Sequence, residues 1–118
     1  MTATLITTRR ATYAGLALAL LGACLTVQGP WWAAVAFGIA PDLPLLFGFG
    51  RGLAHGQIHP RAVPLYNALH RFYGPALLCG AFIALGLSPL APLAWALHIA
   101  VDRTVGYGLR TPDGFPRA

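Results

Sequence analysis

Charged residues are scarce in this chain of 118 residues. Only 9% of the residues are charged and 57% are hydrophobic, whereas soluble domains carry about a quarter charged residues. So little polar surface cannot cover a water-soluble globule. The composition therefore excludes an ordinary soluble domain and predicts an integral membrane protein whose main partner is the lipid bilayer.

Lysine and glutamate are absent, and all eight cations are arginine. The net charge is +5, which on a polar chain would suggest nucleic acid. No basic stripe is interleaved with aromatic residues here, so we expect no nucleic-acid partner, and membrane topology accounts for the arginines better. The wealth of alanine, glycine, leucine and proline is typical of a GC-rich bacterial source. We therefore expect a multi-pass protein of the bacterial inner (plasma) membrane.

Cysteine is rare as well, and no CxxC or disulfide framework is present. Cys24 and Cys79 both lie inside apolar runs, which is typical of buried small hydrophobic residues. The LGAC stretch that ends at Cys24 also fits a bacterial lipoprotein signal, because Arg9 and Arg10 precede its apolar run. The further apolar segments that follow favour a polytopic membrane protein instead.

Four apolar segments are just long enough to cross a bilayer core of about 30 Å, which takes about 20 helical residues. Alternating hydrophobicity is absent, so membrane strands are excluded. Short turns at 28–30 and 86–89 predict two antiparallel helical hairpins. The prediction is an all-α fold in which residues 1–118 form one domain, a four-helix transmembrane bundle. Its helices are predicted at about 12–27, 31–49, 63–87 and 90–107.

The arginines predict how this bundle is oriented. Arg9 and Arg10 precede the first helix, the two short turns carry no charge, and the other arginines lie in or near the central loop and the C-terminal end. The positive-inside rule therefore places both termini in the cytoplasm. We expect four residues at the cytoplasmic interface, where arginines meet anionic headgroups: Arg51, Arg61, Arg103 and Tyr107.

Polar side chains interrupt three of the apolar segments. His98 and Asp102 are four residues apart and share a helix side, as do Asn67 and His70, which are three apart. A carboxylate in hydrocarbon costs at least about 2.5 kcal/mol, so such groups face the bundle interior. Counted at about 1.5 Å per residue, the groups reach a similar depth toward the cytoplasmic side. The predicted polar cluster comprises Asp42, Tyr66, Asn67, His70, His98 and Asp102.

Two prolines flank Asp42 and predict a kink in the second helix. Pro41 and Pro44 lack the backbone donor, which frees carbonyls near Phe37 and Ala40. Irregular backbone at membrane depth is tolerated where it lines a cavity or is covered by protein. We therefore expect the kink to lie beside the polar cluster.

Three functions are compatible with the cluster, and the sequence assigns no catalytic residue. The first is a structural hydrogen-bond network or a small-ligand site in a non-catalytic protein. The second is a metal-dependent hydrolase of a lipid or amphiphile, in which a divalent ion lowers the pKa of bound water; the ligands would be Asp42, His70, His98 and Asp102. The third is an ion- or proton-coupled transporter component, expected to be a homo-oligomer because four short helices enclose only a narrow pore.

Three motifs together resemble a small bacterial membrane-protein family, domain of unknown function 4260. They are PDL at 41–43, HPRAVPLYNALH at 59–70 and AWALHIAVDRTVGYGLR at 94–110. The resemblance implies a four-helix membrane protein without an established activity. Its motifs carry over ten positions: Asp42, Tyr66, Asn67, His70, His98, Asp102, Arg103, Gly106, Tyr107 and Gly108.

The C-terminal end departs from that family, whose members often continue past GYGL with a Phe and then a Thr-His-Leu element. Here the sequence reads TPDGFPRA without a histidine, so we expect any role of that histidine to be absent or optional here. The order Pro-Asp, His, then His with a nearby Asp is also similar to inner-membrane metal-dependent hydrolases. That similarity is an analogy of residue order and type.

Overall fold

A computed structural model describes residues 2–117, and within them the fold is helical. It contains α1 (Ala3–Thr26), α2 (Trp31–Ile39), the 3₁₀ helices η1 (Ala40–Phe47) and η2 (Pro60–Ala62), α3 (Val63–Leu69), α4 (Tyr73–Ala84) and α5 (Leu90–Val105). The described part has no strand beyond one isolated bridge between Arg110 and Pro116. The predicted all-α class is therefore confirmed, whereas Met1 and Ala118 of the predicted domain lie outside the description.

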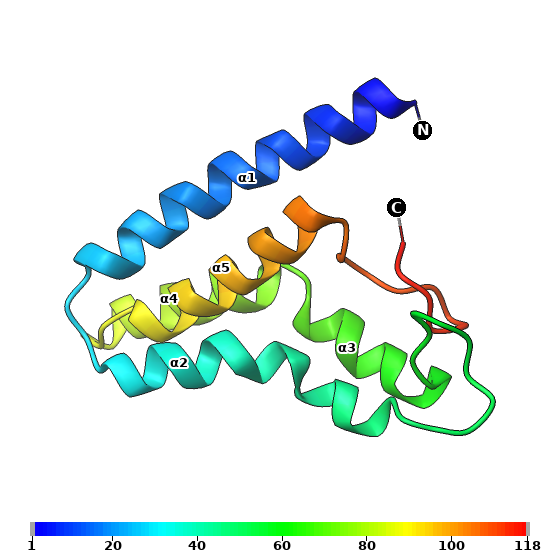
Figure 1. The fold of residues 1–118 in the computed structure, drawn as a ribbon. Coiled ribbons are helices and arrows are strands. Elements are labelled where there is room, and N and C mark those ends of the chain that lie inside the picture. Colours follow the sequence, from blue (N-terminus) through cyan, green and yellow to red (C-terminus); the bar gives the residue numbers. More distant parts are fainter. Residues whose placement is uncertain (1, 118) are drawn as a thin grey trace.

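Helix α5 is the centre of the arrangement. It contacts α1, α2 and α4, and Figure 1 shows α1 along one side of α5 and α2 along the other. Buried residues concentrate on this helix, with Ile99 and Ala100 fully enclosed. The molecule is flat, with extents of 47 × 34 × 19 Å. The shape follows from helices laid beside one central helix.

Helix α1 is longer than the sequence predicts. It begins at Ala3 instead of residue 12, because the Thr2 side chain caps it by accepting from the Leu5 amide at 3.2 Å. No proline or glycine interrupts the next residues, and arginine is a good helix former. Arg9 and Arg10 therefore lie on the helix and not before it.

The second predicted segment kinks at the prolines, as expected. Helix α2 ends at Ile39, and the chain continues as η1 to Phe47, two residues short of the predicted end. Pro41 and Pro44 cannot donate to an α-helical ladder, which explains the change to a 3₁₀ helix. This bend puts Asp42 in the first turn of η1.

The third predicted segment is wrong as one continuous helix. It breaks between α3 and α4, and His70 has non-helical angles of φ −106° and ψ 20°. Pro75 explains the break, because its ring would clash with the carbonyl of Arg71 and it has no amide to bond there. Pro75 lies inside the predicted helix 63–87, so a helix without a break was incompatible with the sequence itself.

The two short turns are where the sequence predicts them, after α1 and after α4. Figure 1 shows that α1 and α2 run in opposite directions, as do α4 and α5. Helix α1 packs mainly against α5, however, and not against the helix that follows it. Among the described helices, none combines the length and the hydropathy needed to cross a membrane. The predicted bundle of four membrane spans is therefore not confirmed.

Candidate metal centre

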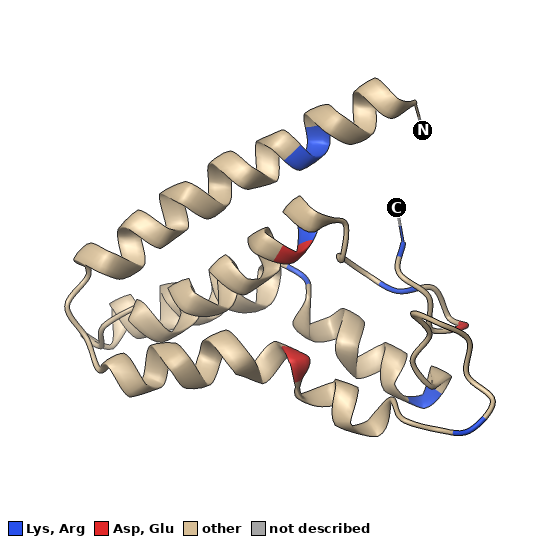
Figure 2. Ribbon diagram, in the orientation of Figure 1, with Lys and Arg blue, Asp and Glu red and all other residues tan. Residues whose placement is uncertain are grey.

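Four ionisable side chains from three separate segments meet at one point. Asp42 comes from η1, His70 from the end of α3, and His98 and Asp102 from α5. Each offers one ligand atom, and these four atoms all lie within 4.8 Å of one another. Figure 2 shows the acidic segments of η1 and α5 on neighbouring stretches of ribbon. The His/Asp cluster predicted from the sequence is therefore present.

The distances within the cluster are nearly uniform. His70 Nε2 lies 3.3 Å from Asp42 Oδ1 and 3.2 Å from Asp102 Oδ2. His98 Nε2 lies 3.2 Å from Asp42 Oδ1 and 3.3 Å from Asp102 Oδ2. The two Nε2 atoms are themselves 3.3 Å apart. Each imidazole Nε2 atom therefore lies at nearly the same distance from both carboxylates and from the other imidazole.

The outer ring nitrogens determine which atoms carry protons. His70 Nδ1 lies 2.7 Å from the Tyr66 carbonyl, and His98 Nδ1 lies 2.7 Å from the Gly38 carbonyl. A carbonyl only accepts, so each Nδ1 must donate its hydrogen. In the neutral rings both Nε2 atoms then carry a lone pair. Four lone-pair atoms therefore converge without a hydrogen between them.

Breaks in the helices make these two carbonyls available. Because α3 ends at Leu69, the His70 amide bonds to Asn67 at 3.2 Å and leaves the Tyr66 carbonyl to the imidazole. In the 3₁₀ pattern of η1 the Gly38 carbonyl would pair with residue 41, which is proline and has no amide. The sequence predicted freed carbonyls near Phe37 and Ala40, and the one used lies between them.

The centre is closed on one side and open on the other. The His70 side chain is fully buried and His98 is 13% exposed, whereas Asp42 is 42% exposed. The Tyr66 ring stacks on His70 with centroids 3.9 Å apart, and this covers the histidine from behind. Any molecule that reaches the centre would therefore approach from the Asp42 side.

Comparison with known proteins assigns the chain to a family. The domain of unknown function DUF4260 matches residues 7–118. The chain belongs to the DUF4260 family. No curated protein and no solved structure matches it.

Two further residues, Tyr66 and Asn67, were predicted to belong to the polar cluster, and only Tyr66 contacts it. Tyr66 stacks on His70, but the Asn67 amide turns to the C-terminal segment, where it donates to the Arg110 carbonyl at 2.9 Å and accepts from the Arg110 amide at 2.7 Å. Asn67 therefore fastens the chain end to α3 and offers no atom to the centre.

Arg103 makes two contacts that the sequence did not predict. It donates to the Tyr13 hydroxyl at 2.9 Å and to the His70 carbonyl at 3.1 Å. It thereby braces the break that carries a candidate ligand. The His70 carbonyl is available only because the helix stops there. In the continuous helix predicted from the sequence, this carbonyl would be bonded within the helix.

The other expected interface residues lie away from the centre. Arg61 donates to the Phe47 and Phe49 carbonyls at 2.9 and 2.7 Å, so it caps the end of η1. Arg51 lies in an exposed turn, and Tyr107 is half exposed just after α5. In the central loop the His59 ring accepts from the Arg61 amide at 3.2 Å.

Two contacts around the centre were not foreseen from the sequence. The Trp95 indole donates to the Leu69 carbonyl at 2.8 Å and so fixes the end of α3. The Arg110 guanidinium lies 5.0 Å from the centroid of the Tyr66 ring, behind the Tyr66–His70 stack. The only sequence signal for Trp95 was its place three residues before His98 on the same helix.

The donor set of this DUF4260 chain suits a divalent ion such as Zn²⁺. Zinc binds imidazole nitrogen and carboxylate oxygen at about 2.0–2.2 Å, which places neighbouring atoms of a tetrahedron about 3.3–3.6 Å apart. Five of the six atom pairs here are 3.2–3.3 Å apart. Each histidine also has the outer hydrogen bond that metal-ligating histidines almost always make. The arrangement can therefore hold one ion with little adjustment.

Proposed function

We propose that this DUF4260 chain is a membrane-embedded, metal-dependent hydrolase whose divalent ion is held by Asp42, His70, His98 and Asp102. The observation that carries the proposal is the convergence of two imidazole Nε2 atoms and two carboxylate oxygens at 3.2–3.3 Å, with both Nδ1 atoms committed to carbonyls. Lone pairs at that spacing repel, and a cation at their centre removes the repulsion.

A purely structural hydrogen-bond network fits the same atoms less well. Such a network needs donors, and the neutral rings have none on the inner side. Protonating one histidine would supply a single inner N–H for two carboxylates and a second imidazole, and protonating both would set two imidazolium N–H groups facing each other across 3.3 Å. A single divalent ion satisfies all four atoms at once. Metal binding is therefore the role that the geometry supports best.

The open side of the centre supports hydrolysis over a closed structural metal site. Zinc can expand from four ligands to five during catalysis, and the exposed Asp42 side leaves room for a water beside the four protein ligands. Only Oδ1 of Asp42 faces the histidines, so its other oxygen is available to take a proton. A bound divalent ion lowers the pKa of water to about 7. An ion held by these four residues would supply activated water for hydrolysis of an ester or phosphoester, and the free Asp42 oxygen would take the proton of that water and return it to the leaving oxygen.

Exposed apolar side chains support a place in the membrane. Leu18 and Leu25 on α1 are 71% and 77% exposed, and Leu77 on α4 is 73% exposed. Helix α1 has no buried residue although it is mostly apolar. Water would penalise this surface by about 25 cal/mol for each Å², whereas hydrocarbon would not. A bilayer is therefore the solvent that we propose for these helices.

The distribution of charge supports an orientation in that membrane. Figure 2 shows the arginines in the half of the molecule away from the α1–α2 turn. Trp31 is 75% exposed at the uncharged end, as expected of an interfacial aromatic residue. We propose that the arginine-rich end faces the cytoplasm. Interrupted helices are tolerated in a bilayer where protein covers the break, and the break at His70 is buried.

Metal analysis of the purified full chain tests the proposal. We expect about one zinc or comparable divalent ion per chain in the wild type, and less than about a tenth of that in His98→Ala, because a ligand is lost. His55→Ala is the matched control, since His55 is exposed in the central loop and should leave the metal content unchanged. Metal-free wild type, or equal metal in both variants, would reject the metal centre.

Activity is tested separately on amphiphilic esters, with a p-nitrophenyl fatty ester and a lipid phosphodiester as probes. We expect turnover by the metal-loaded wild type. The rate of Asp42→Asn should be lower by at least about 100-fold, because the proton acceptor becomes neutral. Bound metal without turnover of either probe class would remove the hydrolase assignment while leaving the metal site intact.

A further inference from the structure

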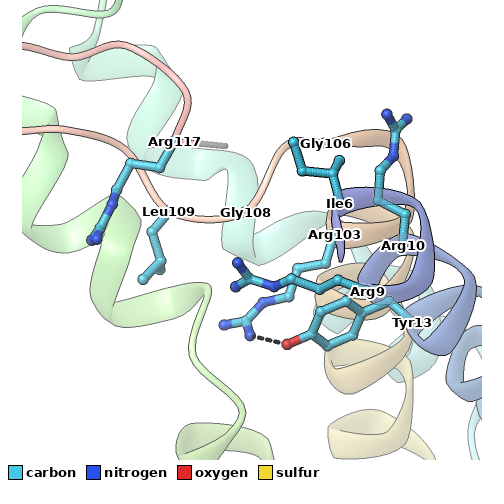
Figure 3. Close-up of a pocket in the computed structure, with 9 residues that line it drawn as sticks. All are labelled: Ile6, Arg9, Arg10, Tyr13, Arg103, Gly106, Gly108, Leu109 and Arg117. Atoms are coloured by element: carbon cyan, nitrogen blue, oxygen red, sulfur yellow. Dashed lines mark hydrogen bonds between the residues drawn. The ribbon is translucent and has the colours of Figure 1, made fainter. Parts of the chain in front are cut away.

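Helix α1 contributes no ligand to the candidate metal centre, and none of its residues is buried. Two hydrogen bonds nevertheless join it to the end of α5. Arg10 donates to the Thr104 carbonyl at 2.8 Å, and the Tyr13 hydroxyl accepts from Arg103 at 2.9 Å. Figure 3 shows the second of these bonds, with the Arg103 guanidinium directed at the Tyr13 hydroxyl. Both bonds end beside the candidate ligand Asp102 in the sequence.

Arg103 continues this connection from α1 to a second candidate ligand. Its other terminal nitrogen donates to the His70 carbonyl at 3.1 Å. One guanidinium group therefore bridges the Tyr13 hydroxyl of α1 and the main chain of His70. The planar guanidinium group presents its donors in a rigid fork, so a change in the position of Tyr13 also changes what Arg103 offers to the His70 carbonyl.

Two aromatic rings stabilise the guanidinium of Arg103 in this place. Its central carbon lies 5.3 Å from the centroid of the Tyr13 ring and 4.9 Å from that of Phe72. The two rings stack with their centroids 6.1 Å apart and an interplanar angle of 14°. A cation within about 6 Å of a ring centroid is attracted to the ring. Because Phe72 follows shortly after His70, these contacts pack α1 against the same break that carries the histidine.

His70 depends on such contacts because it lies outside regular helix. Its backbone angles are φ −106° and ψ 20°, whereas the two candidate ligands on α5 lie within one continuous helix. Helical hydrogen bonds fix the main chain on α5, but at the break other groups must bond the free carbonyls. The Trp95 indole holds the preceding carbonyl, that of Leu69, at 2.8 Å. Arg103 holds the carbonyl of His70 itself.

We propose that Arg103 and Tyr13 form a positioning pair for the metal centre, in which Arg103 fixes the direction of the His70 peptide and Tyr13 fixes Arg103. The His70 Nδ1 atom is bonded to the Tyr66 carbonyl, so a rotation of the His70 peptide would turn Nε2 away from the other three ligand atoms. Helix α1 thereby affects the metal centre without supplying a ligand. This inference rests on the metal centre of the proposed function and assigns two residues that support it.

The first test compares the zinc affinities of two arginine variants of the full chain, measured by competition with a coloured chelator. We expect Arg103→Gln to weaken zinc binding about tenfold, which is the lower end of the effect of outer hydrogen bonds on metal affinity. Arg9→Gln is the matched control, because Arg9 is an exposed cation 6.0 Å from the centroid of the same Tyr13 ring. Its loss leaves the bond to His70 in place. Equal affinities in the two variants would overturn the proposal.

A double-mutant cycle tests the link through Tyr13. Tyr13→Phe keeps the ring beside Phe72 and removes only the hydroxyl, and we expect it to weaken zinc binding about threefold, as the loss of one hydrogen bond would. In the Arg103→Gln background the same change should have no further effect, because Tyr13 acts through Arg103. Unchanged affinity in Tyr13→Phe, or a further threefold loss in the double variant, would contradict the pair.

The visible absorption of the cobalt-loaded chain separates positioning from general stability. The bands of Co²⁺ depend on the number and the directions of its ligands, so a displaced His70 ring changes them even when the site is saturated. We expect saturated Arg103→Gln to differ from wild type in these bands and saturated Arg9→Gln to match wild type. A lower Tm in Arg103→Gln with an unchanged cobalt spectrum would indicate a purely structural role and overturn the proposal.

The metal content of the wild type separates the two proposals from each other. Wild type without metal would reject the proposed function and this inference together. Metal in the wild type, with wild-type affinity and spectrum in Arg103→Gln, would reject the positioning pair alone. Circular dichroism verifies that each variant folds; should Arg103→Gln not fold, the affinity of Tyr13→Phe relative to wild type still decides.

Discussion

His70 and His98 point their Nε2 atoms at each other across 3.3 Å. Neutral imidazoles cannot hydrogen bond in this way, because each has its one hydrogen on the Nδ1 atom that faces a carbonyl. The pair becomes favourable once a cation lies between the two rings and the carboxylates of Asp42 and Asp102. The arrangement of these four side chains therefore favours a bound cation. Removal of the cation, and substitutions in the residues that position the side chains, should then have measurable effects.

Removal of the metal should destabilise the protein. An ion that binds only the folded state adds about 2.7 kcal/mol at a hundredfold excess over its Kd. We expect dialysis against a chelator to lower the Tm by several degrees, and added zinc to restore it. Thermal unfolding followed by circular dichroism is the measurement. Asp102→Asn should show a smaller response to the chelator than wild type, and an unchanged Tm in chelated wild type would contradict the account.

Pro41 should support metal binding without touching the ion. Its missing amide leaves the Gly38 carbonyl to the His98 ring, and hydrogen bonds of this kind are worth about 10- to 100-fold in metal affinity. We expect Pro41→Ala to weaken zinc binding by about that factor, measured by competition with a coloured chelator. Pro112→Ala, in an exposed turn, is the control. Equal affinities in the two variants would argue against this role of the proline.

Gly74 should be intolerant of a side chain. A Cβ there would lie 2.7 and 2.9 Å from two atoms of the Trp95 ring, and the Trp95 indole holds the Leu69 carbonyl beside the candidate ligand His70. We expect Gly74→Ala to lower the free energy of unfolding by about 1–3 kcal/mol. Gly80→Ala on the same helix meets nothing within 4 Å and should be neutral or stabilising. The order of the two Tm values checks the prediction, and a reversed order would refute it.

The exposed leucines of α1 and α4 predict membrane integration. We expect the chain to remain with the membrane pellet after extraction with alkaline carbonate. Both termini lie on the side of the molecule that carries the arginines. Reporter fusions at the N-terminus and at the C-terminus should therefore both report the cytoplasm. Release of the chain into the carbonate supernatant, or fusions on opposite sides, would contradict the proposed placement.

The sequence predicted the helical class and the residues of the His/Asp cluster for physical reasons that did not depend on exact helix boundaries. A carboxylate in an apolar chain needs a partner, and the spacing of His98 and Asp102 already placed both on one side of a helix. The Pro-Asp-Leu-Pro stretch gave the kink, since proline removes donors wherever it lies.

Other features depended on packing between distant residues. Asn67 shares a helix side with His70, yet Arg110 competes for its amide from 43 positions further along the chain. The place of Arg103 depended on the break after α3, because only that break makes the His70 carbonyl accessible. Pro75 was the signal for this break. Helical spacing therefore predicted which polar residues share a helix side. It could not predict which polar atoms are free to bond to residues elsewhere in the chain.

X-ray absorption at the zinc edge of the purified, zinc-loaded chain tests the central claim most directly. The account predicts one shell of nitrogen and oxygen atoms at about 2.0–2.1 Å with the outer scattering of two imidazoles, and one imidazole in His70→Gln. A spectrum with sulfur ligands, with water alone, or with the same two imidazoles in His70→Gln would contradict it.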